Sequence, residues 1–123
     1  MQQNAPVVWI VDSEQWPRAC LRAELIERGC DVRAYLDLDA ALADAARGFP
    51  PPRVLVLELG DQKLDEARLD ALERLGAAVV VLGRAIDLAD PLVRGRRFAS
   101  IMPRPVSLGE VADKVEALAA VRT

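Results

Sequence analysis

Charged and polar side chains stand where the apolar runs of this sequence end. Asp12 and Ser13 follow the run VVWIV, Glu58 closes the run VLVLE, and Arg104 lies directly before Pro105. An arginine suits a carboxylate partner, because its planar guanidinium group presents several N–H donors in a fixed fork. We therefore expect Glu58 to contact Arg104. The alternative is that Glu58 is a solvated carboxylate at a strand end, with no role beyond solubility.

The residue types that carry most enzymatic catalysis are scarce. The sequence contains no histidine, which removes the most common general base and metal ligand and excludes Ser-His-Asp and Cys-His catalysts. Its two cysteines, Cys20 and Cys30, lack metal-ligand spacing, and we expect them to be buried or half-buried thiols of a protein from a reducing compartment. We expect no catalytic residue, no bound metal, no cofactor and no enzyme activity.

The composition is that of an ordinary globular domain. With 123 residues, of which 52% are hydrophobic, the chain can bury a core, and we expect one domain over residues 1–123. The net charge of −3 does not favour nucleic acid or an anionic membrane as a partner. The first residues, MQQNAP, have no basic start, and no apolar run approaches the roughly 20 residues of a membrane span. We expect a cytoplasmic protein.

Apolar runs alternate with amphipathic segments along the whole chain. The pattern predicts strands over residues 7–11, 31–35, 53–59, 77–83 and 97–102. It predicts helices over residues 15–28, 38–47, 62–75, 86–95 and 107–120. Strands that alternate with helices of this length are typical of right-handed βαβ units, which build a parallel sheet in an α/β protein.

The five predicted strands differ in composition. The first, third and fourth are apolar throughout, as expected for central strands with helices on both faces, whereas DVRAY and FASIM are mixed and suit edges. Two edge and three central strands fit a flavodoxin-like sheet with the order 2-1-3-4-5. Ligands of such sheets bind beyond the carboxyl ends of the strands, where the strand order reverses.

Three segments of the chain resemble the receiver domain of bacterial two-component response regulators, the CheY-like family. VVWIVDSEQWPRACLRAEL resembles its first strand, acidic turn and first helix. PPRVLVLEL resembles its third strand, and SIMPRPVSLGEV resembles its fifth strand and the start of its last helix. The resemblance extends over nearly the whole chain and implies the same five-stranded fold.

The family's phosphorylation site implies roles for particular positions. In the family, an aspartate at the tip of strand three accepts a phosphoryl group from a histidine kinase and, with two acidic residues after strand one, holds Mg²⁺. A hydroxyl residue after strand four and a lysine after strand five contact the phosphoryl oxygens. The resemblance places Asp12, Ser13, Glu58, Gly83 and Arg104 at these positions. Because only Asp12 keeps the family's residue type, we interpret the chain as a degenerate pseudo-receiver without the phospho-accepting aspartate.

Three further expectations concern the same region. We expect Mg²⁺ to bind weakly or not at all, since Asp12 and Glu58 alone supply too few oxygen ligands. Asp12 is either a vestigial metal ligand or, as we favour, a turn residue that caps the first helix. The resemblance implies a cis peptide bond before Pro105, with an ordinary trans bond as the alternative. Ile101 stands where the family often carries a switch tyrosine or phenylalanine.

The second half of the chain offers candidates for a protein interface. Arg94, Arg96 and Arg97 form a basic group at the end of the fourth predicted helix, and they either complement that helix's dipole or contact an acidic partner. Receiver-like domains commonly dimerise or bind partners through helix four, strand five and the last helix. The candidate interface residues are Arg94, Arg96, Arg97, Ile101, Glu110 and Asp113.

Taken together, the residues and the resemblance favour a receiver-like signalling module that is not phosphorylated and acts through protein–protein contacts in a bacterial two-component or related pathway. Its partner would be another signalling protein, an output domain or a second copy of the chain, and the sequence leaves open whether the chain is part of a longer protein. Two alternatives stay open. One is a flavodoxin-like domain that binds a nucleotide or flavin, and the other is a receiver that accepts phosphate on Glu58 or Asp61.

Overall fold

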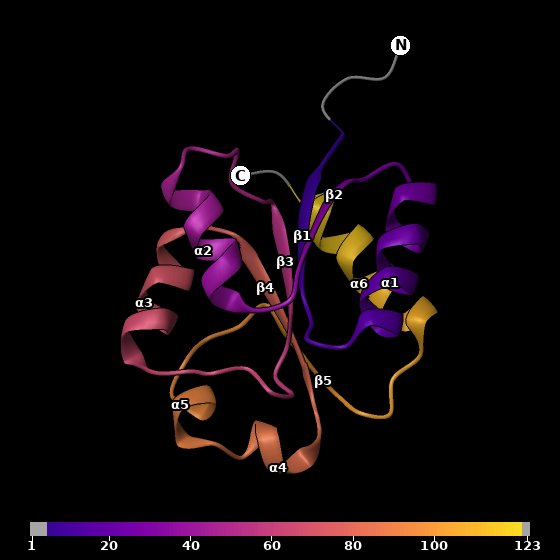
Figure 1. Ribbon diagram of the computed structural model, residues 1–123. Coiled ribbons are helices and arrows are strands. Elements are labelled where there is room, and N and C mark those ends of the chain that lie inside the picture. The colour runs from indigo at the N-terminus through magenta and orange to yellow at the C-terminus, as the bar shows by residue number, and fades with distance from the viewer. Residues whose placement is uncertain (1–4, 122–123) are drawn as a thin grey trace.

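A parallel sheet forms the centre of the protein (Figure 1). The structure, a computed structural model, describes residues 5–121. Within this range the sheet has five strands: β1 (Val7–Val11), β2 (Asp31–Tyr35), β3 (Val54–Glu58), β4 (Ala78–Gly83) and β5 (Ser100–Pro103). Their order is β2-β1-β3-β4-β5, and every pairing is parallel. The predicted flavodoxin-like, CheY-like fold is therefore confirmed.

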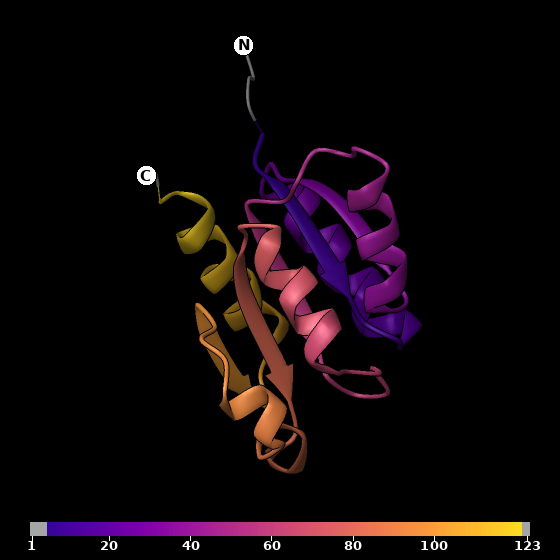
Figure 2. The same ribbon diagram turned by 90° about the vertical axis from the view of Figure 1, so that its left-hand side faces the viewer.

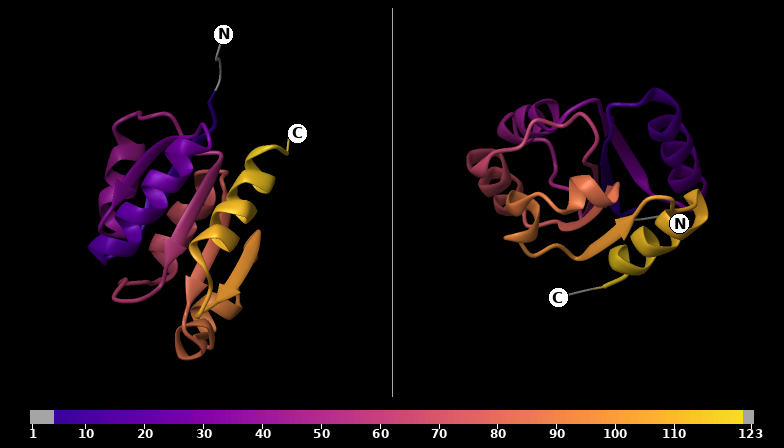
Figure 3. Two further views of the ribbon diagram at one scale, coloured as in Figure 1. Left: turned by 90° about the vertical axis from the view of Figure 1, so that its right-hand side faces the viewer. Right: turned by 90° about the horizontal axis from the view of Figure 1, so that it is seen from below.

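Helices cover both faces of this sheet, as Figures 2 and 3 show from opposite sides. The helices of the described range are α1 (Gln15–Glu27), α2 (Leu38–Ala46), α3 (Glu66–Arg74), α4 (Ala85–Leu88), α5 (Pro91–Arg94) and α6 (Leu108–Ala119). Because successive side chains of a strand point to opposite faces, each central strand contributes to two separate hydrophobic layers. One layer packs against α1 and α6, and the other packs against α2, α3 and α5.

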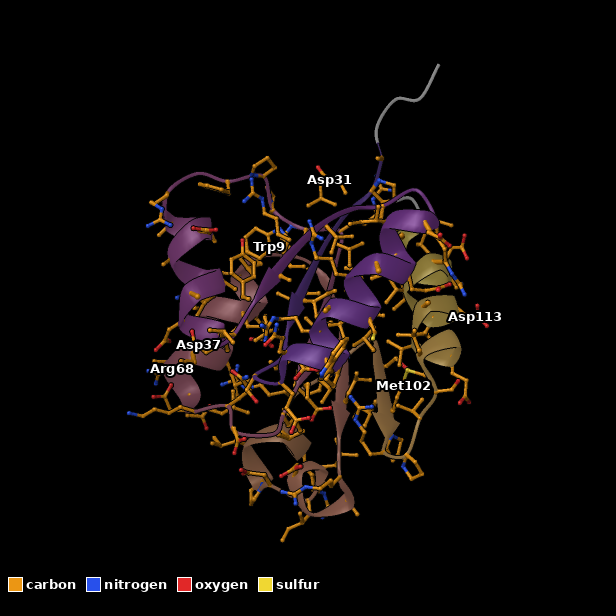
Figure 4. All side chains as sticks on the ribbon, turned by 45° about the vertical axis from the view of Figure 1, so that its right-hand side comes forward. Trp9, Asp31, Asp37, Arg68, Met102 and Asp113 are labelled. Carbon is orange, nitrogen blue, oxygen red and sulfur yellow. The ribbon has the colours of Figure 1, made fainter. Side chains whose placement is uncertain are left out.

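The central strands are buried almost completely. Val8 to Val11 of β1 and Val54 to Leu57 of β3 are at most 1% exposed. The largest of these side chains, Trp9, lies between the sheet and α2 (Figure 4), with its ring centroid 5.2 Å from that of Tyr35. The continuous apolar runs of the sequence thus correspond to strands that are covered on both faces.

Short polar side chains define where several helices begin. Asp37 accepts a hydrogen bond from the backbone N–H of Ala40 at the start of α2, and Asp65 does the same for Arg68 in α3. Ser107 and Glu110 form a reciprocal capping box at the start of α6. These caps place the amino end of α6 directly after the turn that follows β5.

The single helix predicted over residues 86–95 is wrong. The structure has two four-residue helices there, α4 and α5, with Asp90 between them. The backbone turns because Pro91 has no N–H to continue a helix, and the Asp90 carboxylate instead accepts a hydrogen bond from the N–H of Leu92. The chain then returns toward the amino end of β5 as an irregular segment, so β5 begins at Ser100 and not at the predicted residue 97.

The third helix also begins later than predicted, at Glu66 and not at residue 62. Gln62 is held outside the helix, because its amide donates to the carbonyl of Leu36 and accepts from the N–H of Leu38. The N-cap at Asp65 then starts α3. Among the described residues, no helix has the length and apolar composition needed to cross a membrane.

The double-sided burial of β3 predicts a large cost for truncating one of its side chains. Leu55 is fully buried in the layer that packs on α2 and α3, so Leu55→Ala should lower the free energy of unfolding by about 2–5 kcal/mol. Leu36 is 57% exposed, and Leu36→Ala is the control, with an expected change within about 0.5 kcal/mol. Urea unfolding of both variants and the wild type measures the difference. Equal effects of the two substitutions would contradict the assigned burial.

Candidate functional site

The carboxyl ends of β1, β3 and β4 and the turn after β5 meet at one edge of the sheet. The right-hand view of Figure 3 looks onto this edge from below. A hollow of about 450 Å³ opens there, and we call it the acidic crevice. Its charged lining residues are Asp12, Glu14, Glu58, Asp61, Arg84, Asp87 and Arg104. The crevice lies at the point where the strand order reverses, which is where the sheet topology predicts a site.

An ion pair between Glu58 and Arg104 spans the crevice, so the predicted contact is confirmed. Nε and Nη2 of Arg104 lie 2.8 Å and 2.7 Å from the same carboxylate oxygen, Oε2 of Glu58. The other oxygen, Oε1, accepts a hydrogen bond of 3.0 Å from the backbone N–H of Gly60. Both carboxylate oxygens of Glu58 are therefore engaged within the chain. The two side chains are 12% and 32% exposed, so the pair is only partly open to water.

The position of Arg104 depends on the turn that follows β5. Its backbone N–H donates a 2.8 Å hydrogen bond to the carbonyl of Gly83 at the end of β4. The peptide bond between Arg104 and Pro105 is cis, as the family resemblance implied. The chain thus turns sharply between β5 and α6, with the guanidinium group on the side of Glu58.

Asp12 lies at the bottom of the crevice and is only 4% exposed. Its Oδ1 accepts a 2.9 Å hydrogen bond from the backbone N–H of Glu14, which supports its interpretation as a turn residue before α1. Its Oδ2 accepts no hydrogen bond from the residues that the structure describes. Burial raises the pKa of Asp12, and the nearby charge of Glu58 raises it further, while the hydrogen bond from Glu14 lowers it. The neighbouring Ser13 hydroxyl donates to the carbonyl of Gly60 at 3.3 Å.

Gly83 occupies a position where a side chain would be tightly packed. A Cβ atom there would lie 3.2 Å from Cδ1 of Leu59 and 3.3 Å from Cβ of Asp87, closer than ordinary van der Waals contact. Leu59 therefore fills the space in which a hydroxyl residue at position 83 would lie. The next residue, Arg84, turns away to pair with Asp87, its Nε 3.1 Å from Oδ2.

Asp12 and Glu58 are the carboxylates of the acidic crevice that the family resemblance relates to Mg²⁺. Mg²⁺ requires near-octahedral oxygen ligation and is usually held by one or two carboxylates together with several waters. Glu58 is already engaged by a guanidinium group, whose positive charge opposes a divalent cation at the same oxygens. Asp12 has Ser13 and not a second carboxylate directly beside it in the sequence, and Glu14 and Asp61 also line the crevice. In the described part of the chain, no three His, Cys, Asp or Glu side chains are grouped so as to hold a metal ion.

The basic group predicted at the end of the fourth helix is not one surface. The side chain of Arg96 is only 15% exposed and forms ion pairs with Glu66, Asp70 and Glu73 of α3. It therefore anchors the segment before β5 to α3. Arg94 and Arg97 are exposed.

The acidic positions expected to face this basic group also have partners within the chain. Asp113 of α6 pairs with Arg28 of α1 at 2.7 Å, and Glu110 caps α6. Ile101 is 48% exposed on β5. Of the two cysteines, Cys30 is buried as expected, whereas Cys20 is exposed on α1, which corrects that expectation.

Sequence reasoning missed the roles of Leu59 and Gly60. β3 and β4 pair with Glu58 opposite Leu82, so the next pair in register is Leu59 and Gly83. The register of the two strands places a leucine beside a glycine at their ends. This pair indicates that the leucine side chain packs over the glycine, and it could have been predicted from the sequence. The hydrogen bond from Gly60 to Glu58 has no comparable signal, because it depends on how the loop turns after β3.

Comparisons with known proteins agree with this fold. The sequence matches no family model, and no curated protein sequence matches it significantly. Among solved structures, the N-terminal domain of a response regulator/sensory box/GGDEF three-domain protein from Carboxydothermus hydrogenoformans superposes with a TM-score of 0.76 at 16% identity, with 92% of this chain and 93% of that chain covered. The receiver domain of NtrX from Brucella abortus gives a TM-score of 0.74 at 21% identity, over 94% and 99% of the two chains.

A response regulator receiver domain protein from Clostridium thermocellum gives a TM-score of 0.72 at 16% identity, over 93% and 94% of the two chains. At such low identity, these similarities establish that the chain has the fold of receiver domains. The chemistry of its crevice has to be argued from its own residues.

Restoring a hydroxyl residue at position 83 should be destabilising. Gly83→Thr places a branched side chain against Leu59, and we expect a loss of about 1–3 kcal/mol in the free energy of unfolding, the usual cost of overpacking. The same substitution in a Leu59→Ala background should cost less, because the Cδ1 atom that clashes is absent. Denaturant unfolding of the wild type, both single variants and the double variant measures this coupling. An equal cost in both backgrounds would show that Leu59 is not the obstacle.

The raised pKa of Asp12 predicts how the stability of the protein depends on pH. Folded Asp12 holds its proton more tightly than unfolded Asp12, so the folded protein binds more protons at pH values between 3.8 and the raised pKa. Stability from this group is therefore fully present below pH 3.8 and is lost as pH rises through the raised pKa. At pH 7 the buried charge of Asp12 therefore lowers the free energy of unfolding. Asp12→Asn removes this charge and should raise the free energy of unfolding at pH 7. The gain should become smaller toward acid pH.

Urea unfolding at several pH values measures this difference. Asp31→Asn is the control, because Asp31 is exposed at the opposite end of the sheet (Figure 4) and the substitution removes the same charge. A destabilised Asp12→Asn variant at pH 7 would contradict the predicted penalty.

Proposed function

We propose that the protein is a single receiver-like signalling domain that is not phosphorylated and that acts through protein–protein contacts in a two-component or related pathway of the bacterial cytoplasm. We propose further that it has no enzyme activity of its own. The observation that carries the proposal is the Glu58–Arg104 ion pair at the carboxyl end of β3. By resemblance, this is the position at which a receiver domain accepts its phosphoryl group.

The engagement of Glu58 argues against phosphoryl transfer to this residue. A new bond to phosphorus would have to form at Oε1 or Oε2, and these oxygens already accept hydrogen bonds from Gly60 and Arg104. Phosphorylation at Oε2 would break the partly buried ion pair and leave the guanidinium without its carboxylate. Breaking charged hydrogen bonds of this kind costs about 1–3 kcal/mol.

The surroundings also lack the groups that stabilise a transferring phosphoryl group. Phosphoryl transfer depends on fixed cations and donors around the equatorial oxygens. Here the described residues hold no group of three metal-ligating side chains, and Gly83 has no hydroxyl and packs closely against Leu59. The crevice lining carries five carboxylates and only two guanidinium groups, so it repels phosphate anions. The same excess of negative charge weighs against a nucleotide or a flavin phosphate as the ligand.

A permanent ion pair favours one conformation over a phosphate-driven switch. A two-state switch needs an input that interacts differently with the two states. Glu58 already has its ion-pair partner, Arg104, within the same chain. Ile101, at the position of the family's switch aromatic, is 48% exposed and has no ring to rotate into the core. We therefore propose that partner binding is controlled by the amount of protein or by a second input.

Phosphorylation should fail under conditions that label an ordinary receiver domain. We expect no phosphoryl-sized mass increase when the purified protein is incubated with acetyl phosphate and Mg²⁺, as measured by intact-protein mass spectrometry. Glu58→Asp should also stay unlabelled, because a shorter acceptor does not supply the missing metal ligands or the hydroxyl at position 83. A receiver domain with a complete site is the positive control. A stable adduct that maps to Glu58 or Asp61 would overturn the proposal.

A further inference from the structure

A second hollow lies beside the acidic crevice and reaches into the hydrophobic core. It has a volume of about 140 Å³, is lined by residues of α1, α6 and the sheet, and is called the apolar cavity below. Four of its lining residues also line the acidic crevice: Asp12, Pro17, Glu58 and Arg104. The two hollows are therefore neighbours, and the Glu58–Arg104 ion pair belongs to the walls of both.

The inner wall of the apolar cavity is aliphatic. Its side chains come from β1, α1, β3, β4 and α6, and all are at most 5% exposed: Ile10, Leu21, Val56, Leu82 and Val111. They belong to the hydrophobic layer that α1 and α6 cover. A water molecule against this wall would find no hydrogen-bond partner among these side chains. Apolar cavities of roughly 150 Å³ take up a molecule of the size of benzene, so this cavity suits one small ring.

Polar groups line the same cavity at the carboxyl ends of the strands. Asp12 and Glu58 lie two positions beyond Ile10 and Val56, and side chains two positions apart in a strand lie on one face of the sheet. Asp12 is buried and accepts one hydrogen bond, from the N–H of Glu14, although an ionised carboxylate can accept several. The two carboxylates disfavour an anionic ligand. A neutral ligand with an O–H or N–H group could donate to Asp12.

The cavity also reaches the protein surface. Cys20 of α1 and the residues Ser107 and Leu108 at the start of α6 line it, and all three are exposed. α1 and α6 cover the same hydrophobic layer (Figure 1). A ligand can therefore enter between α1 and the start of α6 without unfolding of the domain. A pocket with an apolar interior and a few convergent polar groups is the usual form of a small-molecule site.

We propose that the apolar cavity binds a small neutral molecule of the size of phenol, with its apolar ring against the aliphatic wall and its single donor group on the carboxylate of Asp12. Because Glu58 and Arg104 line the same cavity, such a ligand acts directly beside their ion pair. Its role as the second input of the signalling domain rests on the proposed function. Binding of the ligand does not, and it can be measured on its own.

Phenol serves as the probe, and NMR of the isotopically labelled protein serves as the readout. We expect amide chemical shift changes at residues 10–12, 56–58 and 104–111, a change at the side-chain Nε–H of Arg104, and none in α2 and α3. For so small a ligand we expect a Kd of about 1 mM. Toluene has the same shape without the donor and should bind at least about threefold more weakly, a difference of roughly 0.6 kcal/mol.

A matched pair of variants tests whether the cavity is the site. Val106 is half-buried in the cavity wall, so Val106→Phe should fill part of the cavity and weaken phenol binding at least tenfold. Val121→Phe is the control, because Val121 is 60% exposed after the end of α6 and does not line the cavity. It should leave the affinity within a factor of two.

Alkylation of Cys20 gives a second test that needs no substitution. Cys20 is exposed and lines the cavity, whereas Cys30 is buried, so iodoacetamide should modify Cys20 in the folded protein. The added carboxamidomethyl group lies at the cavity and should also weaken phenol binding. An unchanged Kd after both Val106→Phe and alkylation would show that phenol binds elsewhere.

Four further outcomes would overturn all or part of the proposal. Shifts scattered over the whole surface, or none in the wild type, would refute the site. Toluene binding as tightly as phenol would refute the donor, and an unshifted Arg104 Nε–H would refute the link to the ion pair. The acetyl phosphate experiment is independent. A phosphoryl adduct with intact phenol binding would refute only the proposed lack of phosphorylation, and absent phenol binding without an adduct would refute only the ligand site.

Discussion

Burial of the central strands on both faces governs where this protein can place charge. β1, β3 and β4 have no solvent-exposed face along most of their length, so a charged side chain is tolerated only where a strand ends. Because all strands are parallel, their carboxyl ends lie at the same edge, and that edge collects Asp12, Glu58 and the Arg104 turn. Glu58 is the last residue of β3, and its side chain is still mostly buried. A carboxylate in such a place needs a counter-ion.

The ion pair that meets this need has consequences for the rest of the crevice. Arg104 reaches Glu58 because its own backbone is hydrogen-bonded to Gly83, so the ends of β3, β4 and β5 are joined through one side chain. Leu59, the residue after Glu58, is packed closely against Gly83. Residues 58, 83 and 104 are thus linked by direct contacts. Asp12 differs from Glu58, since it is buried with one hydrogen bond, from the N–H of Glu14, and with no ion pair among the described residues.

Patterns in the sequence that depend on burial were sufficient to predict the fold. Continuous apolar runs identified the central strands, and mixed runs identified the edges β2 and β5. The Glu58–Arg104 contact followed from strand topology and charge, although the arginine uses two nitrogens on one oxygen and leaves the second oxygen to Gly60. Features that depend on local backbone turns were not predicted. Pro91 divides the expected fourth helix, and the resulting change of direction brings Arg96 onto α3 and away from a free surface.

An ion pair formed within the chain limits what an added phosphate could change. A ligand shifts an equilibrium between two states only by the difference between its affinities for them. Because Arg104 is already paired with Glu58, we expect phosphate to differ little in its affinity for the two states. The same pair removes Glu58 from competition for incoming cations. The ion pair therefore ties the electrostatics of the crevice to the chain itself, and a signal that acts there has to compete with Arg104 for Glu58.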